Sequence, residues 1–175
     1  RSLAILMLAQ TRDPDDVARI GKTFDRKQRM NSTLNLAAWA TAYIAVEGPA
    51  AIEHIEQIYL SQPNRSREEL REILQALSIQ ANDDAELRNA IAVTYRTLID
   101  VHPDLASEIT RDLIAWRRWD FVEQIQGIRE GMAGQDPLAA YALGLYLRLA
   151  AGAAPSGPAL PSIVEKGQAR SDIQR

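Results

Sequence analysis

The residues best suited to chemistry are two tryptophans and two arginines in the segment DLIAWRRWDFVEQIQ, residues 112–126. Trp116 and Trp119 enclose Arg117 and Arg118, and Glu123 follows four residues after the second indole. Tryptophan and arginine are enriched among the residues that dominate protein–protein binding, so this group is a candidate partner surface. Large aromatic side chains also fill the space where two helices meet. We favour this second interpretation, a joint between helices.

A second candidate surface is the basic run KTFDRKQR, residues 22–29. Its four cations, which could meet an acidic partner or a phosphate group, are Lys22, Arg26, Lys27 and Arg29. Cations are favoured beside the negative end of a helix dipole. The run is therefore equally typical of a solvated helix C-terminus, and we prefer that interpretation.

The sequence offers little for catalysis or metal binding. It has no cysteine and two histidines, His54 and His102, which do not form a recognisable zinc-ligand spacing. Nucleophile elbows, phosphate-binding glycine loops and dinucleotide fingerprints are absent from it. We predict no catalytic residues, no cofactor and no metal site, and we do not expect an enzyme.

The composition sets the class of protein that carries these residues. The chain has 175 residues, 46% of them hydrophobic, which suffices for one domain with a buried core. Its formal net charge is -3, whereas a broad nucleic-acid footprint usually needs a strongly basic surface, so nucleic acid is a disfavoured partner. The apolar run LAILMLA is far shorter than the ~20 residues of a membrane-spanning helix, so no span is predicted.

Helices must position all of these side chains. Strand-like alternation is nearly absent, and Ala, Leu, Glu and Arg predominate from residue 14 to 151, which predicts an all-α chain. The stretches 36–46 and 138–147 carry no charge, so we expect both helices to be enclosed on several sides. Helix starts are marked by proline at the first helical position or by short polar caps. They are predicted at Pro14, Asn31–Ser32, Pro49, Ser66, Asp83–Asp84, Pro103, near Trp119 and Pro137.

The predicted starts recur at an interval typical of helical repeats. Pro14 and Pro49 are 35 residues apart, and Pro103 and Pro137 are 34 apart. The segment DDAELRNAIAVTYRTLIDVHPDLASEITRDLIAW has an acidic start, Leu87-Arg88 followed by small residues, and a second apolar helix. It resembles a HEAT repeat, and the region 103–125 is similar to HEAT-like regions of uncharacterised bacterial proteins. The resemblance implies an α-solenoid of about four antiparallel helix pairs, HEAT/ARM-like, in a right-handed superhelical stack.

The resemblance implies a non-catalytic protein-interaction or scaffolding module. An alternative comes from the segment Trp119-Asp-Phe-Val-Glu123, which is similar to the Trp-x-x-Val-Asp element of HEAT-fold DNA glycosylases of the alkylation-repair type. That likeness implies a nucleic-acid-binding protein in which Trp119 and Glu123 face the nucleotide. The acid differs from the family pattern, and an acidic chain lacks the phosphate neutralisation that DNA binding needs. The interaction module remains our prediction.

Both ends of the helical region carry apolar segments that predict contact with a partner. LAILMLA at the start and LAAYALGLYLRLA at the end offer more apolar surface than one neighbouring helix can bury. Large exposed apolar patches seldom persist on a monomer. We expect them to be covered by another protein, by other domains of a longer parent chain, or by a second copy.

A further cover for the last helix is the chain's own C-terminal segment. Residues 1–151 form the predicted helical-repeat domain, and residues 152–175 are a proline- and glycine-containing tail or linker. The tail could fold back through Leu160, Ile163 and Val164. We expect a soluble protein, cytoplasmic by default, with periplasmic and secreted locations left open.

Overall fold

The computed structural model describes residues 2–132 and 136–153. Over these ranges the chain is helical and contains no strand, which confirms the all-α prediction. A π-helical turn, Glu56–Leu60, continues α4, and a 3-10 turn, Pro103–Leu105, precedes α7. The helices are α1 (Ser2–Thr11), α2 (Pro14–Arg29), α3 (Leu36–Glu47), α4 (Pro49–Ile55), α5 (Arg67–Asp83), α6 (Ala85–Val101), α7 (Ala106–Ala115), α8 (Val122–Gly131) and α9 (Pro137–Gly152).

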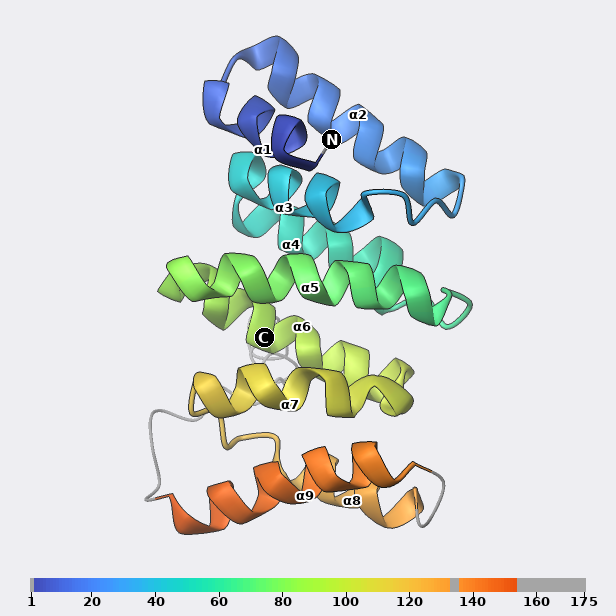
Figure 1. The fold of residues 1–175 in the computed structure, drawn as a ribbon, viewed down its shortest axis with the longest axis vertical. Coiled ribbons are helices and arrows are strands. Elements are labelled where there is room, and N and C mark those ends of the chain that lie inside the picture. The colour runs from blue at the N-terminus through green and yellow to red at the C-terminus, as the bar shows by residue number, and fades with distance from the viewer. Residues whose placement is uncertain (1, 133–135, 154–175) are drawn as a thin grey trace, which may run out of the picture.

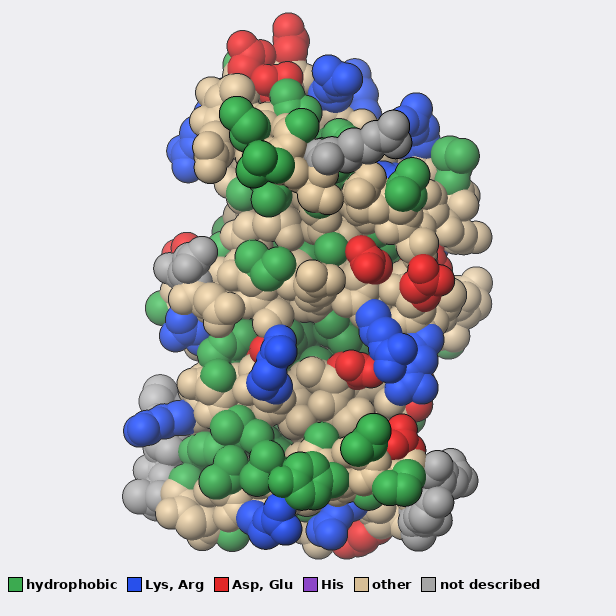
Figure 2. All heavy atoms as spheres, viewed as in Figure 1, with side chains coloured by type: hydrophobic (Ala, Val, Ile, Leu, Met, Phe, Trp, Pro, Cys, Tyr) green, Lys and Arg blue, Asp and Glu red, His purple; other side chains and the backbone are tan. Residues whose placement is uncertain are grey.

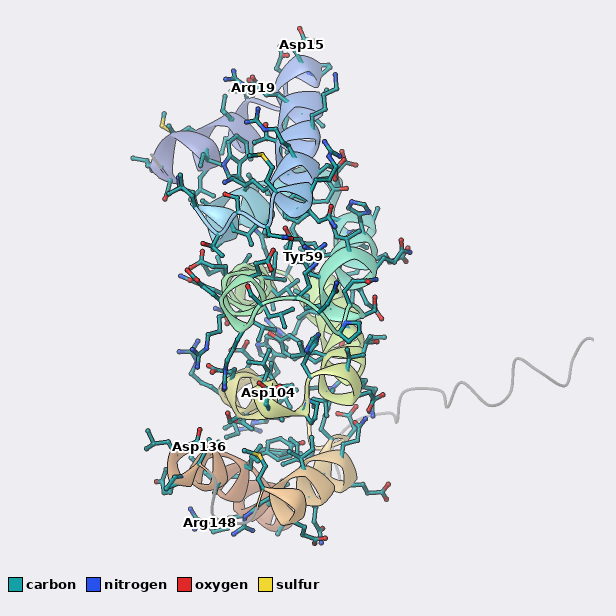
Figure 3. All side chains as sticks on the ribbon, turned by 90° about the vertical axis from the view of Figure 1, so that its right-hand side faces the viewer. Asp15, Arg19, Tyr59, Asp104, Asp136 and Arg148 are labelled. Atoms are coloured by element: carbon teal, nitrogen blue, oxygen red, sulfur yellow. The ribbon has the colours of Figure 1, made fainter. Side chains whose placement is uncertain are left out.

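The chain runs along the long axis of the molecule, from α1 and α2 at one end to α8 and α9 at the other (Figure 1). Odd-numbered helices form one layer and even-numbered helices form the other, as the side view shows (Figure 3). Packing is local in the chain, since α3 packs against α1, α2, α4 and α5, and α9 packs against α7 and α8. Among the described residues, α9 thus packs only against helices that precede it in the chain.

Most of the predicted helix starts are confirmed, and several have their capping contacts. Asp13 precedes Pro14 of α2, and its carboxylate accepts a hydrogen bond from the Asp15 amide. Such caps satisfy backbone amides that have no partner inside the helix. The other confirmed starts are α4 at Pro49, α5 behind the Ser66–Glu69 capping box, α6 behind Asp84, and α9 behind Asp136.

Two predicted starts are wrong, and a third is displaced. Helix α3 begins at Leu36 rather than at Asn31–Ser32, because positive φ angles at Asn31 and Asn35 keep the connection in turns until residue 35. Pro103 opens the 3-10 turn, so α7 starts only at Ala106. The helix expected near Trp119 begins at Val122.

One hydrophobic core runs through the stack from α2 to α9. A smaller cluster of Ile5, Ala9, Ile20 and Ala42 joins α1 and α2 to α3. The π-helical turn places Tyr59 and Leu60, two successive residues, in the core. The largest fully buried side chains of the main core are Tyr59, Tyr95, Tyr146, Phe24 and Phe121.

The two uncharged helices have different surroundings. Helix α3 is enclosed, as predicted, with five buried residues and neighbours on several sides. Helix α9 is not enclosed by the described residues: Leu138 is 82% exposed and Tyr141 is 63% exposed. Hydrophobic side chains gather over α9 in the space-filling view (Figure 2). The tail residues Leu160, Ile163 and Val164, proposed as a cover, lie outside the described residues.

Candidate functional site

Trp116 and Trp119 lie at the joint between α7 and α8. Trp116 is the C-cap residue of α7, and its ring stacks on that of Tyr95 from α6, with centroids 5.7 Å apart. Trp119 follows in the connecting loop and packs against Tyr146 of α9, with centroids 5.5 Å apart. Both indoles are partly buried against the main core. This geometry favours the joint over a free recognition surface.

The charged residues around the tryptophans differ in how much they reach solvent. Arg117 and Glu123 are exposed. Arg118 is only partly exposed and donates to both carboxylate oxygens of Asp120 at 3.0 Å. Burial raises the pKa of Asp120, but hydrogen bonding and charge from Arg118, with the charge of Arg96, outweigh burial and lower the pKa below its usual value. Arg118 is therefore engaged within the loop that joins α7 to α8.

The predicted basic run divides between two sides of α2. Lys22, Arg26 and Arg29 are exposed, and so is Arg19. The four residues follow one another at intervals of three, four and three positions. Residues at this spacing share one helix face, over about 15 Å. Lys27 lies elsewhere: its ammonium group donates to the Leu34 carbonyl oxygen, and burial and the charge of Arg26 lower its pKa.

We call Arg19, Lys22, Arg26 and Arg29 the α2 basic face. No ion pair between described residues involves any of the four. Asp25 of the same helix contacts His54 of α4 instead, at 3.2 Å. Lys and Arg side chains are visible over α2 at this end of the molecule (Figure 2). Just beyond the basic face, Met30 is 69% exposed and Leu34 is 65% exposed.

A groove of about 410 Å³ lies between α5 and α7. The space-filling view shows it as a hollow between the two helices, with hydrophobic side chains inside and basic side chains at its rim (Figure 2). Its deepest lining residues are Tyr95, Ile109 and Asp112, which are 0%, 1% and 8% exposed. A carboxylate thus lies among the buried residues that line the groove.

Hydroxyl groups from two other helices hold the Asp112 carboxylate. The Ser78 hydroxyl of α5 donates to Oδ1 at 2.9 Å, and the Tyr95 hydroxyl of α6 donates to Oδ2 at 2.9 Å. Burial, followed by the charge and hydrogen bond of Asp112, raises the pKa of Tyr95 well above its usual value. Tyr95 therefore stays protonated and keeps its role as a donor.

Nothing in the sequence marks Asp112 as part of a site. The residue stands beside Leu113, one of the apolar positions that identify α7, and a lone aspartate between Arg111 and Leu113 carries no signal of its own. Its partners lie 34 and 17 residues away in the chain. Only the packing of three helices brings the three groups together.

The structure keeps the candidate sites apart. The α2 basic face lies at the N-terminal end of the stack, whereas the tryptophan joint lies near α8 and α9 at the other end (Figure 1). No group of three His, Asp or Glu side chains in the described part of the chain could hold a metal ion. None of the helices in residues 2–132 and 136–153 is long and apolar enough to cross a bilayer.

Comparison with known proteins finds no relative: no family model, no curated protein and no solved structure matches the chain.

Proposed function

We propose that this chain is a HEAT-like helical-repeat module, an α-solenoid, that binds another protein or another domain of its parent chain and catalyses no reaction. The two-layer arrangement supports the proposal, because helical repeats pack mainly against their neighbours in the chain. The 35-residue spacing of the helix starts at Pro14 and Pro49 supports it as well.

The α2 basic face is the observation that carries the proposal. Four cations share one helix face and form no ion pair with a described residue, although the chain as a whole has a formal net charge of -3. Long-range attraction of an acidic partner speeds encounter and orients the two surfaces. An acidic segment of a protein therefore fits this face.

The neighbouring apolar side chains favour a protein over nucleic acid. Met30 directly follows Arg29 of the basic face, Leu34 lies four residues further along the chain, and both are largely exposed. A phosphate backbone would leave both of them in water, whereas an amphipathic acidic segment could cover them. The partner we propose is thus a protein segment with carboxylates along one side and apolar residues at one end.

Charge reversal tests this surface. The variant Lys22→Glu/Arg26→Glu/Arg29→Glu reverses three of the four charges of the basic face. The control Arg117→Glu/Arg129→Glu/Arg148→Glu makes the same change in net charge at exposed positions on other elements. Both would carry a photo-reactive residue in place of Met30, and mass spectrometry would identify what is cross-linked in source cells. We expect an acidic segment, of another protein or of the parent chain, to be cross-linked by the control and lost from the α2 variant.

Equal cross-linking by the two variants would contradict the proposal. The alternative, a nucleic-acid-binding protein related to alkylation-repair DNA glycosylases, predicts instead that capture is sensitive to nuclease and to Glu123→Gln. No contact of Trp119 or Glu123 specifically favours it, since Trp119 packs against Tyr146.

A further inference from the structure

We infer that the groove between α5 and α7 binds a guanidinium or ammonium group, which pairs with the carboxylate of Asp112. This inference concerns a different surface from the α2 basic face and does not depend on the function proposed for it. It rests on the charge of one buried group, on the shape of the groove and on the side chains at its rim.

The carboxylate of Asp112 is buried without a buried cation beside it. Asp112 is 8% exposed, and its hydrogen-bond donors among the described residues are the neutral hydroxyls of Ser78 and Tyr95. The nearest cation in an ion pair with it is Arg111, whose Nε lies 3.8 Å from Oδ1 and whose side chain is 86% exposed. Burial of a carboxylate is unfavourable unless charge or hydrogen bonds compensate for it.

The carboxylate also has unused acceptor capacity. An ionised carboxylate has about four lone-pair sites, and the two hydroxyls occupy two of them. The other basic group near the groove is already engaged, because Arg71 donates to Glu108 at 2.6 and 2.9 Å across the rim. A cation that enters the groove therefore meets a carboxylate that has free acceptor sites and whose ion-pair partner, Arg111, is largely in solvent.

The walls suit a cation carried on an alkyl chain. Leu74, Ile79 and Ile109 line the groove and can pack against methylene groups, while the amides of Gln75 and Asn82 lie at its edge as further hydrogen-bonding groups. The volume of about 410 Å³ is in the range of small-ligand pockets and accommodates one long side chain. A metal ion suits the site less well. The hydroxyls of Ser78 and Tyr95 both donate to the Asp112 carboxylate, so the carboxylate is the one strong metal ligand at the floor of the groove.

The experiment is an NMR titration of the full chain with butylguanidinium and, separately, with butylammonium. Pentanamide serves as the neutral probe of similar size. We expect a saturable shift of the Ser78, Ile109 and Asp112 amide signals with a cation and about tenfold weaker binding of pentanamide, as loss of a charge-assisted contact predicts. A blocked Gly-Arg-Gly peptide tests the source: tighter binding than butylguanidinium points to a protein segment, and weaker binding points to a free small cation.

Three variants test whether the charge of Asp112 holds the cation. Asp112→Asn keeps the size of the side chain and removes its charge, and should weaken cation binding about tenfold or more. Glu86→Gln, which removes one exposed carboxylate elsewhere, should leave binding unchanged. If Asp112→Asn fails to fold, Ile79→Lys decides, since an ammonium group at the half-exposed rim should compete for Asp112 and abolish probe binding. The inference is overturned if no cation gives saturable shifts, or if a folded Asp112→Asn or Ile79→Lys variant binds the cations as the wild type does.

Discussion

Tyr59 and Tyr95 are both fully buried, but their hydroxyl groups have different surroundings. The Tyr95 hydroxyl donates to Asp112, whereas the Tyr59 hydroxyl has no hydrogen-bond partner among the described residues. Tyr95→Phe should lower the free energy of unfolding by about 1 to 3 kcal/mol, because Asp112 loses a donor. Tyr59→Phe should leave stability unchanged or raise it, because it removes a hydroxyl that is not satisfied.

Urea unfolding of the two variants makes the comparison. Each variant loses one oxygen atom from a buried ring, so the cavity term is nearly the same for both. A loss in Tyr59→Phe as large as in Tyr95→Phe would mean that the hydroxyl of Tyr59 has a partner in solution.

Trp119 tests whether the joint between α7 and α8 depends on its indole. Trp119→Ala should lower the free energy of unfolding by about 3 kcal/mol, the low end for truncation of a core aromatic residue, because the indole is only partly buried. Trp119→Phe keeps a ring against Tyr146 and should lose much less, as measured by urea unfolding. If the alanine variant lost under about 1 kcal/mol, the indole would contribute little to packing, and a recognition role would regain support.

Sequence reasoning at the residue scale succeeded where the cause was local. The interval between Pro103 and Pro137 placed Trp116 and Trp119 near a helix joint, and the structure agrees. It could not find the contacts of Asp112, nor the hydrogen bond that Arg118 donates to the Asn89 side chain of α6, because these depend on residues from other helices.

At the scale of elements, replacing Gly48 or Gly127 by alanine should change stability in opposite directions. Gly48 joins α3 to α4 with φ 61° and ψ -136°, a conformation that is strained for any L side chain. Gly48→Ala should therefore lower stability by about 1 kcal/mol or more, although the space around it is open. Gly127, within α8, also has open space around it, and Gly127→Ala should raise stability by about 0.5 to 1 kcal/mol. Thermal unfolding measures both, and shifts of the same sign would contradict the argument.

Helix starts were predicted where the signal lies within one turn of sequence. Ser66 with Glu69 and Asp136 with Pro137 are of this kind, since caps act over two or three residues. The start of α3 was missed because its connection depends on the positive φ of Asn31 and Asn35, which the sequence pattern does not reveal. Enclosure of α9 was expected from composition, but enclosure depends on neighbours that composition does not supply.

The whole molecule should lose stability in base. Burial raises the pKa values of Tyr59 and Tyr146 to about 12, whereas an unfolded tyrosine releases its proton near pH ~10. Above that pH the unfolded chain binds fewer protons than the folded chain, so the free energy of unfolding falls as pH rises from about 10 to about 12. The slope approaches about 1.4 kcal/mol per pH unit for each such tyrosine.

Urea unfolding at several pH values in this window measures the slope. Tyr146→Phe should make it shallower, whatever its effect on stability at neutral pH, because one titrating group is removed. Stability that stays constant through the window would show that these hydroxyls reach solvent in the folded chain.

Packing in this stack joins segments that lie close together in the sequence. Among the described residues, the side-chain hydrogen bond of largest sequence separation joins Thr97 to Glu56, 41 residues apart. During synthesis, α3 can dock onto α1 and α2 before α5 has left the ribosome, and each later helix finds its neighbours already made. The order of translation and the order of assembly then coincide. At any moment a nascent chain has one growing apolar edge to shield from aggregation, and among the described residues the exposed side of α9 is such an edge.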